Sequence, residues 1–197
     1  MTSYVALFRG INVGGKNILP MQELRNILAS LGCEDVQTHI QSGNAVFSSG
    51  ESANKLSGKV RNAIESQFGF APQVLLQSVE QFRAIASANP YPEAEATPKL
   101  LHVWFLIEKA GNADIDGMNA LKADSEQFTL AEEALYLHAP DGIGRSRLAA
   151  KIDRHLGVST TARNWRTVRK LLDLAKYLNI GAREELLSGH ERTLTTP

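Results

Sequence analysis

The 197-residue chain has one cysteine, no long apolar run and no excess of charge of either sign, and each absence excludes a class of protein. Cys33 alone forms no intramolecular disulfide and no cysteine-based zinc site, which favours a reducing compartment. No segment reaches the roughly 18–20 apolar residues that a bilayer span needs, so we expect no membrane partner. The N-terminus lacks a signal-peptide pattern, and we therefore predict a cytoplasmic protein.

The charge balance argues against a protein that coats nucleic acid. Lys and Arg number 21, Asp and Glu number 21, and the formal net charge is zero. Nucleic-acid binders usually carry a basic excess, so nucleic acid is a less favoured partner. Hydrophobic residues make up 43% of the chain, which is enough for the core of one or two domains.

The first half of the sequence predicts a β-α-β-β-α-β series followed by a short helix. Apolar runs bounded by turn residues predict strands, and apolar residues spaced by three or four predict helices. The predicted strands are 4–9, 36–40, 45–48 and 73–78, and the predicted helices are 20–31, 54–68 and 80–88. This order is that of the ferredoxin-like fold, in which two helices cover one face of an antiparallel sheet.

The second half predicts the same order again. The predicted strands are 100–107, 126–130, 134–138 and 158–161, and the predicted helices are 113–121, 147–156 and 165–178. We therefore predict an α+β fold of two ferredoxin-like units, 1–90 and 99–181, with a linker at 91–98 and a polar, mobile tail at 182–197. The alternative is one continuous sheet with scattered helices.

A glycine-rich segment follows the first predicted strand. The run GINVGGKN at 10–17 matches the first seven positions of the phosphate-binding motif G-x-x-x-x-G-K-[ST]. Asn17 replaces the hydroxyl that holds magnesium, and the helix is predicted to begin only at Pro20, so a nucleoside triphosphatase is disfavoured. A weaker anion site remains, with charge from Arg9 and Lys16. Alternatively, the glycines only let the chain turn, while Asn12 and Asn17 bond the loop to itself.

Two further polar segments accompany this loop. Gln41-Ser42-Gly43-Asn44 lies between two predicted strands and either binds a ligand or serves only as a hairpin turn. Arg163 and Arg166 flank the start of the last predicted helix, which Asn164 caps. Positive charge opposes the helix dipole there, and a bound anion would relieve the conflict. The alternative is an ordinary solvated face, and the acidic stretch 108–133 either opposes or neutralises this basic region.

Three segments together resemble the signature of the family called domain of unknown function 1697. They are YVALFRGINVGGKN at 4–17, HIQSGNAVF at 39–47 and TARNWRTVRKL at 161–171. The resemblance implies a two-part ferredoxin-like α+β fold, in agreement with the predicted element order. It implies no particular activity, substrate or cofactor. His39 stands where the family often has an aromatic residue.

The sequence favours a binding module for an anionic, phosphate-bearing small ligand. The predicted contacts are Arg9, Asn12, Lys16, Asn17, Gln41, Ser42, Asn44, Arg163, Asn164 and Arg166. The alternatives are an enzyme of unknown reaction at the same motifs, an RNA-binding protein whose sheet displays Phe8 and Phe47, and a self-associating scaffold. We assign no catalytic residue and predict no metal or cofactor, because no nucleophile elbow or paired-carboxylate motif is visible. The oligomeric state stays open.

Overall fold

The computed structural model describes residues 1–190, which form an α+β structure with two compact units. The first unit comprises Met1–Phe82 with the segment that begins at Lys170, and the second comprises Arg83–Arg169. The domain limits predicted from the sequence, 1–90 and 99–181, stay predictions, because compactness does not test which segment folds independently. The predicted tail at 182–197 begins within helix α6 (Trp165–His190), and its residues 191–197 lie outside the described residues.

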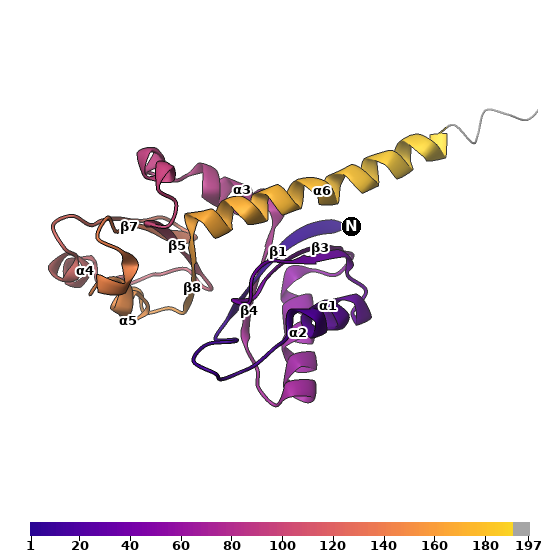
Figure 1. Cartoon of the computed structure of the whole chain (residues 1–197), viewed down its shortest axis with the longest axis horizontal. Helices are drawn as coiled ribbons and strands as arrows, with labels where there is room; N and C mark the ends of the chain where they lie inside the picture. Colours follow the sequence, from indigo (N-terminus) through magenta and orange to yellow (C-terminus); the bar gives the residue numbers. More distant parts are fainter. Residues whose placement is uncertain (191–197) are drawn as a thin grey trace, which may run out of the picture. The chain divides into compact units, whose positions relative to one another are not determined.

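The first unit is built on a four-stranded antiparallel sheet of order β2-β3-β1-β4. Its strands are β1 (Thr2–Arg9), β2 (Glu34–Thr38), β3 (Asn44–Ser49) and β4 (Gln73–Ser78). Helix α1 (Met21–Ser30) follows β1, and helix α2 (Ala53–Phe68) follows β3. Both helices lie on one face of the sheet (Figure 1).

The core of the first unit lies between that face and the two helices. Alternate residues of a strand point to the same face, which directs Tyr4, Ala6 and Phe8 of β1 inward. Buried residues of α2 recur every four positions, at Leu56, Val60 and Ile64, and so form the apolar stripe of one helix face.

The RNA-binding alternative depended on aromatic rings displayed by this sheet. Phe8 and Phe47 are 1% and 0% exposed, and both belong to the core. Rings in this position do not stack on RNA bases, so that premise was wrong. The reason is the register of the strands, which turns both rings toward the helices rather than away from them.

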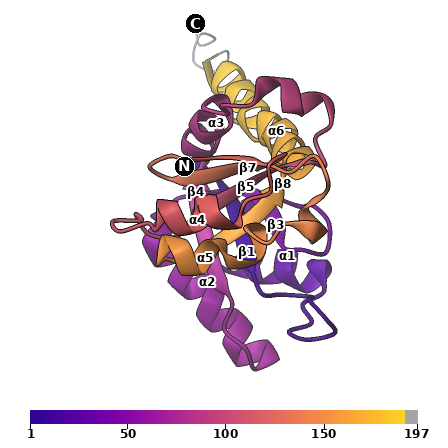
Figure 2. The same ribbon diagram turned by 90° about the vertical axis from the view of Figure 1, so that its left-hand side faces the viewer.

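The second unit repeats the arrangement with a sheet of order β6-β7-β5-β8. Its strands are β5 (Leu101–Leu106), β6 (Gln127–Leu130), β7 (Ala134–His138) and β8 (Thr160–Asn164). Its helices include α4 (Ile115–Leu121) and α5 (Ile152–Leu156), which lie on one face of the sheet (Figure 2). Trp104 and Leu106 of β5 pack there in one core with Met118 of α4 and Ile152 of α5.

Several segments differ from the sequence prediction, among them β2, which covers Glu34–Thr38 instead of 36–40. The expected helix 147–156 is a 3-10 turn, Ala149–Lys151, followed by α5. The Ser146 hydroxyl accepts a hydrogen bond from the Ala149 amide, the first residue of that turn. The last strand covers Thr160–Asn164 instead of 158–161. In α6, the sequence predicts an apolar stripe of Trp165, Val168, Leu172 and Ala175. Leu171 is buried instead of Leu172, which is only half-buried, so that one position was wrong.

The segment predicted as a linker, 91–98, contains the 3-10 helix Pro92–Ala96. Tyr91 is only 9% exposed, and its hydroxyl lies 2.8 Å from the Thr129 hydroxyl of β6. Helix α3 (Val79–Ser87) precedes this segment. The Tyr136 hydroxyl of β7 donates a hydrogen bond of 2.5 Å to the Ile85 carbonyl, which ties the end of α3 to the second sheet.

Candidate functional site

The segment between β1 and α1, residues 10–19 and hereafter the glycine loop, is a small hairpin that projects beyond the end of β1 (Figure 1). The Lys16 amide donates to the Val13 carbonyl, and the Asn12 amide to the Asn17 carbonyl, each at 3.0 Å. Gly14 and Gly15 have φ of +57° and +74°, as the two central residues of a type I′ turn require. The glycines therefore make a reverse turn and do not wrap a phosphate as in a P-loop.

Asn12 fixes the base of the glycine loop. Its side-chain oxygen accepts from the Leu19 amide at 2.8 Å, and its side-chain nitrogen donates to the Leu19 carbonyl at 2.9 Å. The same nitrogen donates to the Gln41 carbonyl at 2.8 Å, which joins the loop to the turn between β2 and β3. The Asn17 side chain donates to the Gly10 carbonyl at 2.8 Å. Both asparagines thus hold the backbone.

The turn between β2 and β3, residues 39–43 and hereafter the β2–β3 turn, is packed against the same base. Gly43 has φ of +75°, and a Cβ there would lie 2.5 Å from Ile11 Cδ1 and 2.7 Å from Phe8 Cβ. Asn44 is 0% exposed, and its side-chain nitrogen donates to the His39 carbonyl at 3.0 Å and the Ser42 hydroxyl at 3.1 Å. Glycine is required at 43, and Asn44 supports the turn from inside.

The exposed part of this region is cationic and aliphatic. Lys16, Gln41 and Ser42 are exposed, and Arg9 is half-buried. The same two segments contain three large exposed apolar side chains, namely Val13 at 66%, Ile18 at 55% and Ile40 at 52%. Neither the glycine loop nor the β2–β3 turn contains an acidic residue. The surface therefore suits a ligand that is anionic and partly apolar.

Ile40 is held in an unfavourable backbone conformation. Its φ is +49°, a region that β-branched residues rarely occupy. Such a conformation costs about 1–3 kcal/mol and is found most often at ligand contacts and switch regions. The position keeps an aliphatic side chain at the surface at a cost to stability.

The other predicted contacts lie in the second unit. Arg163 is 8% exposed, and its Nη1 donates at 2.8 Å to both the Thr161 hydroxyl and the Ala162 carbonyl. Burial lowers the pKa of its guanidinium to about 10. Asn164 accepts from the Thr167 amide at 2.9 Å, which confirms the predicted cap of the last helix. Arg166 is exposed. A common surface of these residues with Lys16 stays a prediction.

The sequence prediction missed some exposed or paired side chains. Val13 and Ile18 could have been noticed in the sequence, because aliphatic residues are unusual in a segment rich in turn-forming residues. The pair of Asp114 and His155 could not have been noticed, because the two residues are 41 positions apart. Their side chains meet at 2.9 Å, and the Gly117 amide, followed by His155, lowers the pKa of the Asp114 carboxyl.

The described residues offer neither a metal site nor a membrane-spanning helix. Among residues 1–190, no three His, Cys, Asp or Glu side chains are grouped so that they could hold a metal ion. Within that same range, no helix is both long and apolar enough to cross a membrane.

Fold and site together define an α+β protein with two four-stranded antiparallel sheets and a polar, glycine-rich loop after the first strand. The model of the family described as protein of unknown function (DUF1697) matches residues 1–136. The chain belongs to this family, as its motifs predicted.

The chain is also similar to a solved structure, that of the conserved bacterial protein SP0830 from Streptococcus pneumoniae. The TM-score is 0.68 at 27% sequence identity, and the match covers 88% of this chain and 98% of the other. No curated protein matches the chain.

Proposed function

We propose that the protein is a binding module, and that the glycine loop and the β2–β3 turn of the first unit bind an anionic, phosphate-bearing small ligand. One observation carries the proposal. Lys16 lies at the end of a fixed hairpin and follows Gly14 and Gly15. The backbone N–H groups of these two glycines make no hydrogen bond to any residue in the range 1–190. An ammonium group and adjacent amide donors are the groups that bind phosphate oxygens.

The bonds of Asn12 support the proposal because they lower the entropic cost of binding. A loop that is already ordered does not have to lose conformational freedom when a ligand arrives. Asn12 ties both ends of the hairpin and the neighbouring turn through three hydrogen bonds of 2.8–2.9 Å. Since no acidic side chain belongs to either segment, no local charge opposes an incoming anion.

The aliphatic side chains favour a ligand that carries more than a bare phosphate. Val13, Ile18 and Ile40 are each more than half exposed. Apolar side chains near a few polar groups are typical of sites for small organic ligands. A phosphate ester with a flat or aliphatic organic group would contact these side chains while its phosphate meets Lys16.

We further propose that each unit is ferredoxin-like and that the protein works in the cytoplasm. The first proposal is supported by the strand orders β2-β3-β1-β4 and β6-β7-β5-β8, with a helix after the first and third strand of each unit. The second is supported by the single cysteine, which is buried.

The proposal is tested by titrating the ¹⁵N-labelled protein with inorganic phosphate and with adenosine monophosphate at low ionic strength. We expect the amide signals of Gly14, Gly15 and Lys16 to shift, with a Kd of about 1 mM or below for the nucleotide. Lys16→Gln should weaken binding about tenfold, whereas the exposed control Lys99→Gln should not. The absence of shifts with both compounds would refute the proposal.

A second pair of variants separates the two parts of the surface. Val13→Ser with Ile18→Ser should weaken binding of the nucleotide and leave that of phosphate unchanged. Ile115→Ser, an exposed aliphatic residue of the second unit, is the matched control. Equal losses for both ligands would mean that the apolar side chains only shape the loop.

A further inference from the structure

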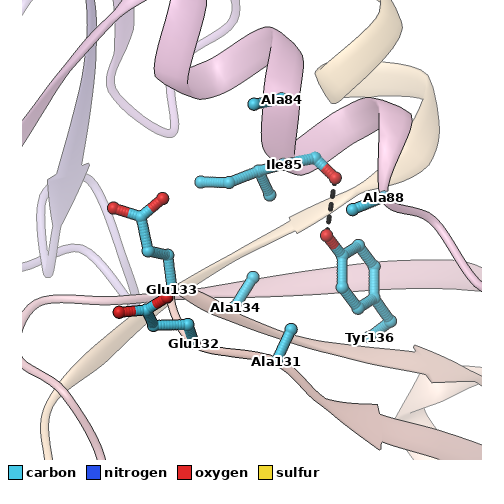
Figure 3. A pocket seen from close by; sticks show the side chains of 8 residues that line it. All are labelled: Ala84, Ile85, Ala88, Ala131, Glu132, Glu133, Ala134 and Tyr136. Carbon is cyan, nitrogen blue, oxygen red and sulfur yellow. Dashed lines mark hydrogen bonds between the residues drawn. The ribbon is translucent and has the colours of Figure 1, made fainter.

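The second unit contains a small groove between the end of α3 and the turn that joins β6 to β7 (Figure 3). Its volume is about 220 Å³. It is hereafter called the alanine groove, and it is lined by Ala84, Ile85, Ala88, Ala131, Glu132, Glu133, Ala134 and Tyr136. Four of these residues are alanines, so the groove has a methyl-lined wall and two carboxylates at one end.

The groove exists because the residues that face one another across it are small. Ala84 and Ala88 are four residues apart and therefore project from the same side of the α3 segment. Ala131 and Ala134 provide the opposite wall. The bond from the Tyr136 hydroxyl to the Ile85 carbonyl holds the two walls at a fixed distance (Figure 3). The space is thus built into the fold.

The charge of the groove is negative. Glu132 and Glu133 are its only ionised lining residues at neutral pH, and both are exposed. The side-chain carboxylate of Glu133 makes no hydrogen bond or ion pair with any residue in the range 1–190, whereas that of Glu132 pairs with Lys109. Burial, with a smaller contribution from the charge of Glu133, raises the pKa of Tyr136 to about 12. Both carboxylates lie at one end of the groove (Figure 3).

We propose that the alanine groove binds an ammonium group carried on a short aliphatic chain, supplied either by a free alkylamine or by a lysine side chain. The ammonium group would lie between the carboxylates of Glu132 and Glu133. The aliphatic chain would lie along the alanine methyls, as lysine stems commonly cover apolar surface. The pair of Lys109 and Glu132 shows that an ammonium group already binds at this end of the groove.

Size and chemistry exclude other ligands. Pockets for drug-sized molecules enclose about 300–1,000 Å³, so a cavity of about 220 Å³ holds a single chain and not a ring system. Divalent cations prefer six or more oxygen ligands, and here an alanine-rich wall faces only two carboxylates. An anion would meet two like charges. A compact ammonium ion needs only nearby carboxylates and tolerates an apolar wall.

The Lys109 pair does not block this site. Its side chains are 79% and 71% exposed, and exposed ion pairs are weak and screened by salt. A second ammonium group can therefore share or replace Lys109 at Glu132 while Glu133 accepts it from the other side. Lys109→Gln should consequently leave binding unchanged or strengthen it.

The test uses the full chain and three small probes, namely pentylammonium, N-acetyl-lysine-methylamide and the uncharged 1-pentanol. We expect the amide signals of Ala84, Ala88 and Ala134 to shift on addition of an ammonium probe, with a Kd of about 1 mM. Binding of pentylammonium alone identifies a free amine as the source, and binding of the lysine derivative identifies a side chain. No shift with either ammonium probe, or equal shifts with 1-pentanol, would overturn the proposal.

Two variants test the groove itself. Glu133→Gln should reduce the affinity about tenfold and remove most of its salt dependence. Ala88→Leu should fill the groove and abolish binding. Ser87→Leu adds a similar side chain at an exposed neighbour that does not line the groove, and it should leave binding intact. Ser87 and Ala88 are both exposed, and circular dichroism checks that the two variants fold. Unchanged binding by a folded Ala88→Leu would overturn the proposal.

Discussion

The two units share one strand order but differ in their equivalent hairpin turns. In the first unit, the β2–β3 turn is bonded to the glycine loop through Asn12, and neither segment contains an acid. In the second unit, the turn between β6 and β7 carries Glu132 and Glu133 and faces the end of α3. The same place in the topology therefore has no Lys, Arg or acidic residue in the first unit and two glutamates in the second, which illustrates that a shared fold does not determine function.

The units also differ in their helical layers. In the first, α1 and α2 span Met21–Ser30 and Ala53–Phe68, whereas in the second α4 and α5 span only Ile115–Leu121 and Ile152–Leu156. The chain has two tryptophans, Trp104 and Trp165, and both are in the second unit. Tryptophan fluorescence thus reports the unfolding of the second unit, and hydrogen exchange of the glycine-loop amides reports the opening of the first.

The largest effect is expected for Gly43→Ala in the first unit. The substitution combines a positive φ with a Cβ that would lie 2.5 Å from Ile11 Cδ1. Strain and overpacking each cost about 1–3 kcal/mol, so we expect a loss of about 3 kcal/mol in the free energy of unfolding. Urea unfolding followed by circular dichroism measures this loss.

Two further glycines separate the contributions of strain and packing. Gly10 has φ of +77° with open space around its Cβ position, and Gly50 has open space without a positive φ. Gly10→Ala should cost about 1 kcal/mol through strain alone, and Gly50→Ala should cost almost nothing. If all three variants lost the same stability, the close approach of the β2–β3 turn to Ile11 would not matter.

A smaller loss is expected for Asn12→Ala. The variant removes three hydrogen bonds, to the Leu19 amide, the Leu19 carbonyl and the Gln41 carbonyl. Net contributions of about 0.5–1.5 kcal/mol per bond predict a total loss of about 2 kcal/mol. Hydrogen exchange of the Leu19 amide should accelerate. The urea midpoint of the second unit, followed by tryptophan fluorescence, should not change. If the urea midpoint of the second unit also fell, the two units would unfold together.

Elements with strong apolar patterns were predictable from the sequence. β4 and β7 were predicted with their observed limits, because each is a short apolar run that a proline limits at one end, Pro72 before β4 and Pro140 after β7. The apolar stripe of α2, with Leu56, Val60 and Ile64 spaced by four, was equally clear in the sequence. β8 was placed too early because its last residues, Arg163 and Asn164, are polar although they pair with β5. A rule based on apolar runs cannot detect a strand whose place is fixed by pairing.

The candidate sites were predictable only in part. The glycine loop and the turn after β2 were recognised as polar motifs, but the bond that joins them links Asn12 to a residue 29 positions later. The alanine groove depends on a contact between Ile85 and Tyr136, which are 51 positions apart. Contacts of this kind depend on how whole helices and strands pack together. A local sequence pattern therefore cannot predict which distant residues meet.

A loss of about 1 kcal/mol is expected for Asn164→Ala, which removes the cap of α6. Asn164→Asp keeps an acceptor for the Thr167 amide and should retain most of the stability. Trp165 is the next residue and 3% exposed, so its fluorescence reports the change directly. Equal losses for both variants would show that the amide nitrogen of Asn164, and not its oxygen, matters.

The smallest effect at neutral pH is expected from His102 of β5, which is 8% exposed and has an Nδ1 without a hydrogen-bond partner in the range 1–190. Burial lowers its pKa, and a hydrogen bond to the Leu100 backbone offsets this only in part. The unfolded chain therefore takes up a proton near pH 6.5, while the folded chain remains neutral until a lower pH. Stability that is present above about pH 6.5 is lost as the pH falls through this window.

The His102 ring lies 6.0 Å from that of Trp104, so tryptophan fluorescence detects the transition. The urea midpoint of the second unit should fall between about pH 7 and pH 5 in the wild type and stay nearly constant in His102→Leu. If both proteins lost stability in parallel, another group would be responsible, and the acid response would not distinguish the two units.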